Sequence, residues 1–231
     1  MKNLVLIGAL LCVIVPVGVS PAQATPVLIL TDAITNDTIS IVDNGPNDLG
    51  QKLGVIIYTG GLPNNGSGPS GWILNITAGV TKPEYGSAQD PKMDLMTGSL
   101  STSGGGTLNI SFSENDFDPS SPSNLSLNIH ASTTGSMEAV AYFDPNNQLF
   151  QGTMLAAIGP FGPGAFVGST SGDLSGITGP YSLTEDVHIV HLGPGITVFD
   201  ENLRVVPEPA SLIVFTLGLL GIGWFRVFRR L

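Results

Sequence analysis

Hydrophobic and polar residues alternate in two segments near the middle of the chain. In residues 107–113 and 125–130, every second position is Leu, Ile or Phe, and the positions between them carry Asn, Ser, Thr or His. Successive side chains of a β-strand point to opposite faces, so this period of two predicts strands with one buried and one solvent-facing side. We therefore expect both segments to belong to an antiparallel sheet that is covered on one side.

Six other segments are apolar without strict alternation, which predicts strands that are buried more deeply. These segments are residues 27–30, 55–58, 72–76, 139–143, 187–192 and 196–199. Clusters of Gly, Pro, Asn and Asp, which are typical of turns, lie between them. Short strands separated by frequent turns favour an all-β fold, and we expect a single antiparallel β-sandwich of jelly-roll type.

Residues 154–168 do not follow this pattern. They mix Gly, Pro, Ala and Phe, and their apolar positions have neither the period of a strand nor that of a helix. We expect an ordered loop that is held in place by its apolar side chains.

The N-terminal segment, residues 1–24, has the three parts of a secretory signal peptide. Lys2 precedes an apolar stretch over residues 4–15, and Ala22 and Ala24 form a small-x-small cleavage site. Cleavage after Ala24 removes Cys12, which is the only cysteine of the sequence. We therefore expect the exported chain to fold without a disulfide.

The C-terminal segment, residues 207–231, also has three parts. It opens with two prolines around an acidic residue, namely Pro207, Glu208 and Pro209. An uncharged and mostly apolar run over residues 210–225 follows. At a rise of about 1.5 Å per residue, a helix of this length just spans a hydrocarbon core of about 30 Å, and only if the basic residues behind it reach out to the lipid headgroups. The segment ends in three basic residues, Arg226, Arg229 and Arg230. Their positive charge is expected to hold this end on the cytoplasmic side.

The order of these three parts resembles the PEP-CTERM sorting signal of exported bacterial proteins. The resemblance implies that the tail anchors the chain in the membrane transiently. It also implies that an exosortase-type enzyme then cuts near the motif and passes the protein to the cell envelope or the extracellular matrix. A permanent single-span anchor is the alternative interpretation of the same residues. In both cases residues 25–206 form the exported domain.

This domain is strongly acidic. Residues 25–206 hold 17 Asp and Glu against four Lys and Arg, a formal charge of −13, whereas the whole chain has a net charge of −10 because its ends are more basic. Such a charge repels nucleic-acid phosphates, so we expect no nucleic-acid partner. The many Ser, Thr and Asn residues suit contact with hydrated polymers, and exopolysaccharide is a candidate partner.

The sequence offers no recognisable catalytic motif. The domain has no cysteine and no Gly-x-Ser-x-Gly elbow, and its three histidines form no metal or catalytic motif. His188 and His191 are three residues apart, so on one strand they would point to opposite faces. We therefore expect a protein without catalytic residues and without a cofactor.

Two groups of acidic residues leave other functions open. Glu114, Asp116 and Asp118 alternate at the end of a strand, which would place three carboxylates on one face, as a calcium site needs. They lack the glycine and the distal glutamate of an EF-hand loop, so solvated carboxylates without a metal are the simpler interpretation. Residues 185–186 and 200–201 each combine Glu with Asp, and glycosidases use two carboxylates.

The sequence thus predicts an exported, non-enzymatic protein of the cell surface or the extracellular matrix, with a structural or polymer-associated role. A calcium-dependent carbohydrate-binding or adhesive module is one alternative. A polysaccharide hydrolase is the other.

Overall fold

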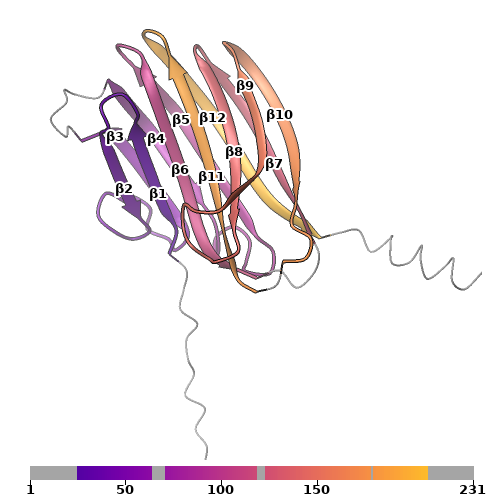
Figure 1. Ribbon diagram of the computed structural model, residues 1–231. Coiled ribbons are helices and arrows are strands. Elements are labelled where there is room, and N and C mark those ends of the chain that lie inside the picture. Colours follow the sequence, from indigo (N-terminus) through magenta and orange to yellow (C-terminus); the bar gives the residue numbers. More distant parts are fainter. Residues whose placement is uncertain (1–24, 64–70, 119–122, 178, 208–231) are drawn as a thin grey trace, which may run out of the picture.

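The computed structural model describes residues 25–63, 71–118, 123–177 and 179–207. Within these residues the chain forms two six-stranded antiparallel sheets that pack face to face (Figure 1). The predicted all-β sandwich is therefore confirmed. The signal peptide and the tail helix were predicted for segments outside the described residues. Among the described residues, no helix has the length and apolarity that a membrane crossing requires.

The first sheet, sheet A, contains the two strands of the chain's first hairpin and four later strands. Its order is β2 (Thr38–Val42), β1 (Val27–Asp32), β6 (Gly106–Phe117), β11 (Tyr181–His191), β8 (Ser136–Asp144) and β9 (Thr153–Phe161). The second sheet, sheet B, has the order β10 (Gly164–Asp173), β7 (Ser123–Thr133), β12 (Gly195–Pro207), β5 (Lys92–Thr102), β4 (Trp72–Val80) and β3 (Val55–Gly61). The chain crosses between the sheets at each step from β5 to β8, as in a jelly roll.

The core lies between the two sheets, and the alternation of the sequence explains which side chains enter it. In β6, Leu108, Ile110 and Phe112 are fully buried, and the residues between Leu108 and Phe112 face outward. Leu125 and Leu127 of β7 enter the core from the opposite sheet. The alternation predicted for both segments is therefore confirmed. Each such side chain stabilises the fold by about 1.5–3 kcal/mol through burial of apolar surface.

The expectation of a loop over residues 154–168 is wrong. This segment holds β9 and β10, two edge strands that are joined by Gly162 and Pro163 and belong to different sheets. An edge strand needs few bulky side chains, and it tolerates a proline such as Pro160 because one side of its backbone has no partner strand. The small residues and prolines that hid the period are therefore compatible with strands at this place.

Two strands, β2 and β5, were not predicted at all. In β5, Met93 and Leu95 are buried, whereas Met96 is exposed, so the start of this strand does alternate. Its inward side includes Met and Thr, which weakens the apolar signal.

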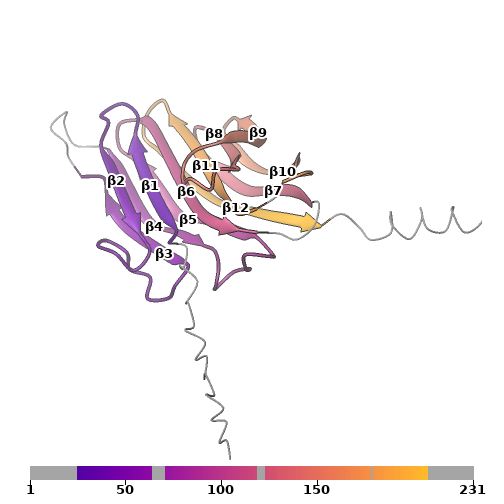
Figure 2. The same cartoon turned by 60° about the horizontal axis from the view of Figure 1, so that its bottom comes forward.

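The start of β1 and the end of β12 lie at the same end of the sandwich (Figures 1 and 2). The turns β1–β2, β5–β6, β7–β8, β9–β10 and β11–β12 lie at the opposite end. The last described residue, Pro207, therefore leads into the tail from the end that is remote from these turns.

Candidate functional site

The outer face of sheet A carries a band of polar side chains on three adjacent strands. Asp186 of β11 is aligned with Ser111 of β6 on one side and with Val140 of β8 on the other. One pleat further along, Thr184 is aligned with Tyr142. Because residues that are aligned across a sheet share a face, these side chains project together away from the core.

Asp186 is the centre of a chain of polar contacts on this band. Ser111 Oγ donates a hydrogen bond to Asp186 Oδ1 over 2.8 Å, and His188 Nε2 lies 3.4 Å from Asp186 Oδ2. His188 Nδ1 lies 2.8 Å from Asn109 Oδ1. Burial raises the pKa of the Asp186 carboxyl, while His188 and the hydrogen bond from Ser111 counteract this rise. The contacts fix the carboxylate in one orientation.

A loop between β8 and β9, residues 145–152, crosses the outer face of sheet A in front of these strands (Figure 1). Asp144, the last residue of β8, precedes the loop, and its carboxylate accepts a hydrogen bond from the backbone N–H of Gln148 over 3.0 Å. Several hydrogen bonds then hold the loop against the sheet. Ser182 Oγ donates to the carbonyl of Gln148 over 2.6 Å, and the N–H of Phe150 donates to Ser113 Oγ over 3.2 Å.

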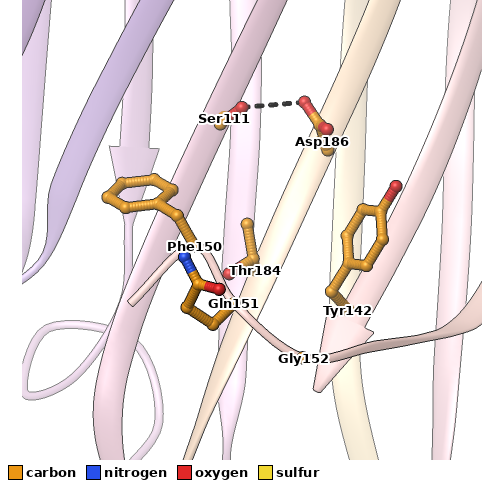
Figure 3. Close-up of a pocket in the computed structure, with 7 residues that line it drawn as sticks. All are labelled: Ser111, Tyr142, Phe150, Gln151, Gly152, Thr184 and Asp186. Carbon is orange, nitrogen blue, oxygen red and sulfur yellow. Dashed lines mark hydrogen bonds between the residues drawn. The ribbon is translucent and has the colours of Figure 1, made fainter. Parts of the chain in front are cut away.

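The loop and the sheet enclose a cavity of about 300 Å³ (Figure 3). Its lining consists of Ser111, Tyr142, Phe150, Gln151, Gly152, Thr184 and Asp186. The rings of Phe150 and Tyr142 lie on opposite sides of it, and the side chains of Gln151 and Thr184 lie between them (Figure 3). The cavity therefore combines two aromatic rings with hydroxyl, amide and carboxylate groups.

The chemistry of these groups suits binding. Burial is the main cause that raises the pKa of Tyr142, and the charges of Asp186 and Glu138 raise it further, so the phenol stays protonated and can donate a hydrogen bond. Asp186 lies between Ser111 and His188 in the contact chain. Activation of a serine needs the opposite order, with the imidazole between the hydroxyl and the carboxylate. The contact chain is thus a row of polar contacts between adjacent strands, and it does not have the order of a catalytic triad.

The three carboxylates considered for calcium lie in different surroundings. Glu114 is fully buried and forms an ion pair with Lys82 Nζ over 2.9 Å. Asp116 adopts a positive φ of 59°, which breaks the alternation of β6, and its Oδ1 accepts a hydrogen bond from Asn147 Nδ2 over 2.6 Å. Asp118 is exposed beyond the end of β6. Within the described parts of the chain, no group of three or more His, Cys, Asp or Glu residues is arranged to hold a metal.

The four carboxylates considered for a glycosidase lie in three different parts of the sandwich. Asp186 lies on the outer face of sheet A and Asp200 is exposed on sheet B, whereas Glu185 and Glu201 are fully buried in the core. His188 and His191 do point to opposite faces, as predicted. His191 is buried, with its ring 5.5 Å from that of Trp72 and its Nε2 2.9 Å from Thr197 Oγ1.

Part of this cavity could be predicted from the sequence. The alternation placed Ser111 on a solvent-facing side, and Asp186 was considered as a carboxylate with a function. Tyr142 was recognised only as part of a strand, and Phe150 and Gln151 were not recognised. Phe150 follows a run of turn residues and has a positive φ of 57°, and no periodicity predicts where such a residue lies.

Comparison with known proteins identifies the C-terminal tail. Residues 205–230 match the family model of the PEP-CTERM protein-sorting motif. The predicted sorting signal is thus confirmed, and it marks the chain as an exported protein. This match concerns the tail, not the β-sandwich. No curated protein matches the sequence significantly.

Several solved structures have a similar arrangement of strands. Tailspike protein 4 of bacteriophage CBA120 aligns with a TM-score of 0.34 and 15% identity over 59% of this chain and 20% of that one, so the chain spans about a fifth of the tailspike structure. TmCBM61, solved with β-1,4-galactotriose, aligns with a TM-score of 0.33 and 7% identity over 59% of this chain and 88% of that one. The C-terminal CBM6 of LamC from Zobellia galactanivorans aligns with a TM-score of 0.25 and 9% identity over 77% and 98% of the two chains. These values describe a likeness in fold class alone.

Proposed function

Because the chain carries a PEP-CTERM sorting signal, we propose that it is a non-enzymatic protein of the cell surface or the extracellular matrix. There the cavity on the outer face of sheet A binds a neutral carbohydrate polymer. An exosortase-type enzyme processes the tail after a transient stay in the membrane, and the sandwich is the part that is delivered.

The feature that best supports this function is the combination of Tyr142 and Phe150 with hydrogen-bonding groups in one cavity. Sugar rings offer apolar C–H faces and a rim of hydroxyl groups, so a binding site needs flat apolar surfaces together with donors and acceptors. The rings on the two sides of the cavity supply the apolar surfaces, and Gln151, Thr184 and Asp186 supply the hydrogen-bond donors and acceptors. A volume of about 300 Å³ lies at the lower end of the range for small-ligand sites, so the cavity suits a short stretch of a polymer.

The charge of the protein favours a neutral polymer over an anionic one. The whole chain has a net charge of −10, and the cavity itself contains the carboxylate of Asp186 and no Lys or Arg. A uronate or sulfate group in the cavity would therefore meet like charge without a cationic partner.

The experiment is sedimentation of the mature protein with insoluble neutral polysaccharides, namely cellulose, mannan, xylan and starch, with soluble alginate as an anionic competitor. We expect at least one neutral polymer to retain the protein and alginate not to release it. Tyr142→Ala and Asp186→Asn should each weaken retention. Tyr85→Ala is the matched control, because it removes a half-buried tyrosine whose hydroxyl accepts a hydrogen bond from Asn202 of sheet B.

Loss of retention in Tyr85→Ala to the same degree as in Tyr142→Ala would contradict the assignment of the cavity. Release of reducing ends from any retained polymer would favour the hydrolase instead. Retention that disappears on addition of EDTA and returns with Ca²⁺ would favour the calcium-dependent module.

A further inference from the structure

The two sheets end in edge strands whose outer sides differ in accessibility. In sheet B, the edge of β3 is covered by the preceding segment. The N–H of Ile57 donates to Asp48 Oδ1 over 2.9 Å, and the carbonyl of Ile57 accepts from the N–H of Leu49 over 2.8 Å. A further strand therefore cannot pair with β3 at this position.

The edges of sheet A are protected in other ways. β2 is only five residues long. β9 has two register shifts against β8 and contains Pro160, which has no N–H to donate. Short strands, bulges and prolines are devices by which natural sheets avoid pairing with other chains.

β10, the other edge of sheet B, has none of these devices. Its ten residues pair with β7 in unbroken register, from Gly164 opposite Thr133 to Asp173 opposite Asn124. It contains no Pro and no Lys, and every residue in it is exposed or half-buried. No backbone hydrogen bond from another described residue reaches its outer side. An edge of this kind is a template for pairing with another strand.

The surface around β10 is almost free of charge, although the protein is acidic. Residues 145–172 contain no Asp, Glu, Lys or Arg, and the neighbouring strand β7 contains none either. Two apolar side chains project from this flank, Val167 with 68% and Met154 with 56% of its surface exposed. A second molecule of the same acidic protein meets the least repulsion if it approaches here.

We propose that β10 pairs antiparallel with β10 of a second copy of this chain, so that the two B sheets form one continuous sheet. Residues that oppose each other in a sheet share a face, and the exposed residues of β10 include Val167, Ser169 and Ser171. A two-fold axis at Ser169 places Ser169 opposite its own copy and Val167 opposite Ser171. The carboxylate of Asp173, the only charge on the strand, then lies at opposite ends of the two strands.

This dimer goes beyond the proposed carbohydrate binding, because the cavity on sheet A is complete in one chain. It is also closed. Since the other edges are short, covered or irregular, pairing at β10 produces dimers rather than fibres.

The test is disulfide cross-linking of the full chain in cells of its host. In the proposed register the two Cα atoms at position 169 lie about 4.5–5.5 Å apart, which is within reach of a disulfide. We expect Ser169→Cys to yield a dimer on oxidation that reverts to monomer on reduction. Ser40→Cys, an exposed position on the edge strand β2, and the wild-type chain should remain monomeric. A monomeric Ser169→Cys chain, or an equal dimer yield for Ser40→Cys, would overturn the proposal.

A second variant distinguishes cross-linking through paired β10 strands from cross-linking through random encounters of two molecules. Val167→Lys in the Ser169→Cys background places a charge on the open edge, and it should lower the cross-linking yield by about tenfold. Because Val167 is exposed, the change leaves the core untouched. Val167→Thr, which keeps the shape and adds no charge, should cross-link like Ser169→Cys alone. Unchanged yield in Val167→Lys, or a ladder of larger multimers, would contradict the closed dimer.

Discussion

Glu185 of β11 and Glu201 of β12 point into the core from opposite sheets, and both side chains are fully buried. Burial is the main cause that raises the pKa of each carboxyl well above its usual value. The negative charge of Glu201 raises the pKa of Glu185 further. Since two charged carboxylates in an apolar core would be very costly, the folded protein holds this pair in its neutral form.

The buried pair makes the stability depend on pH. In the unfolded chain both groups ionise at about pH 4.3, whereas the folded chain retains their protons to higher pH. The stability that they contribute is therefore complete below that pH and is lost as the pH rises. We expect the free energy of unfolding to fall by on the order of 1 kcal/mol per group and pH unit above about pH 4.5. Thermal unfolding of the mature protein between pH 4 and pH 8 measures this fall.

Two other carboxyls, one half-buried and one fully buried, act in the same direction. Burial raises the pKa of Asp94 to about 6 and that of Glu114 to about 6. The contribution of the core pair is isolated by Glu185→Gln/Glu201→Gln, which should raise the melting temperature near pH 7 and flatten its pH profile. Glu84→Gln removes an exposed carboxylate and serves as the control, with an unchanged profile. A double variant that melts at a lower temperature than the wild type at every pH would contradict the neutral pair.

The ion pair of Lys82 and Glu114 should matter far more than a surface pair. Lys82 Nζ lies 2.9 Å from the fully buried Glu114 carboxylate and 4.1 Å from the centre of the Phe117 ring. Lys82→Met leaves the carboxylate buried without its cation, and we expect a loss of about 3–5 kcal/mol in the free energy of unfolding near pH 7. Lys52→Met breaks an exposed pair and should cost less than about 1 kcal/mol.

Chemical unfolding of the two variants tests this difference. Adding Glu114→Gln to Lys82→Met should recover part of the loss, because the unpaired charge is then removed. Equal effects of Lys82→Met and Lys52→Met would show that the buried pair has no special role.

The sequence predicted those strands in which apolar and polar residues alternate along the chain. β6 and β7 were recognised because each has one face in the core and one in water. β9 and β10 were missed because edge strands use small residues, and the carboxylates after Phe112 were misaligned because the positive φ of Asp116 interrupts the alternation.

The cavity was harder to predict than the strands. Its wall depends on hydrogen bonds between residues that are distant in sequence, such as Phe150 with Ser113 and Gln148 with Ser182. Nothing in the local pattern around residues 145–152 specifies these partners. Only the pairing of β6 with β11 brings Ser113 and Ser182 together under the loop.

Gly79 is expected to tolerate no side chain. A Cβ atom at this position of β4 would lie 2.6 Å from a ring carbon of Phe112, which is fully buried on the opposite sheet. Gly79→Ala should therefore lower the free energy of unfolding by about 1–3 kcal/mol through overpacking. At Gly104 a Cβ would meet no atom within 4 Å, so Gly104→Ala is the control and should be nearly neutral. Phe112→Leu should restore stability to Gly79→Ala if the clash with the ring is the cause.

Residues 205–230 match the PEP-CTERM sorting motif, and β12 extends to Pro207, so the matched segment begins within the last three residues of this strand. Proline disfavours helix at its own position and at the residue before it, so we expect the two prolines of the motif to leave this junction accessible to a processing enzyme. We expect mass spectrometry of the protein from its host to find a chain that begins at Thr25 and ends close to the motif.

Replacing Pro207, Glu208 and Pro209 by Ala should leave the chain uncut in the membrane fraction. Replacing Ser211 by Ala, just beyond the motif, is the matched control and should allow normal processing. Recovery of residues 210–231 still joined to the sandwich, in wild-type cells that make the processing enzyme, would favour a permanent anchor.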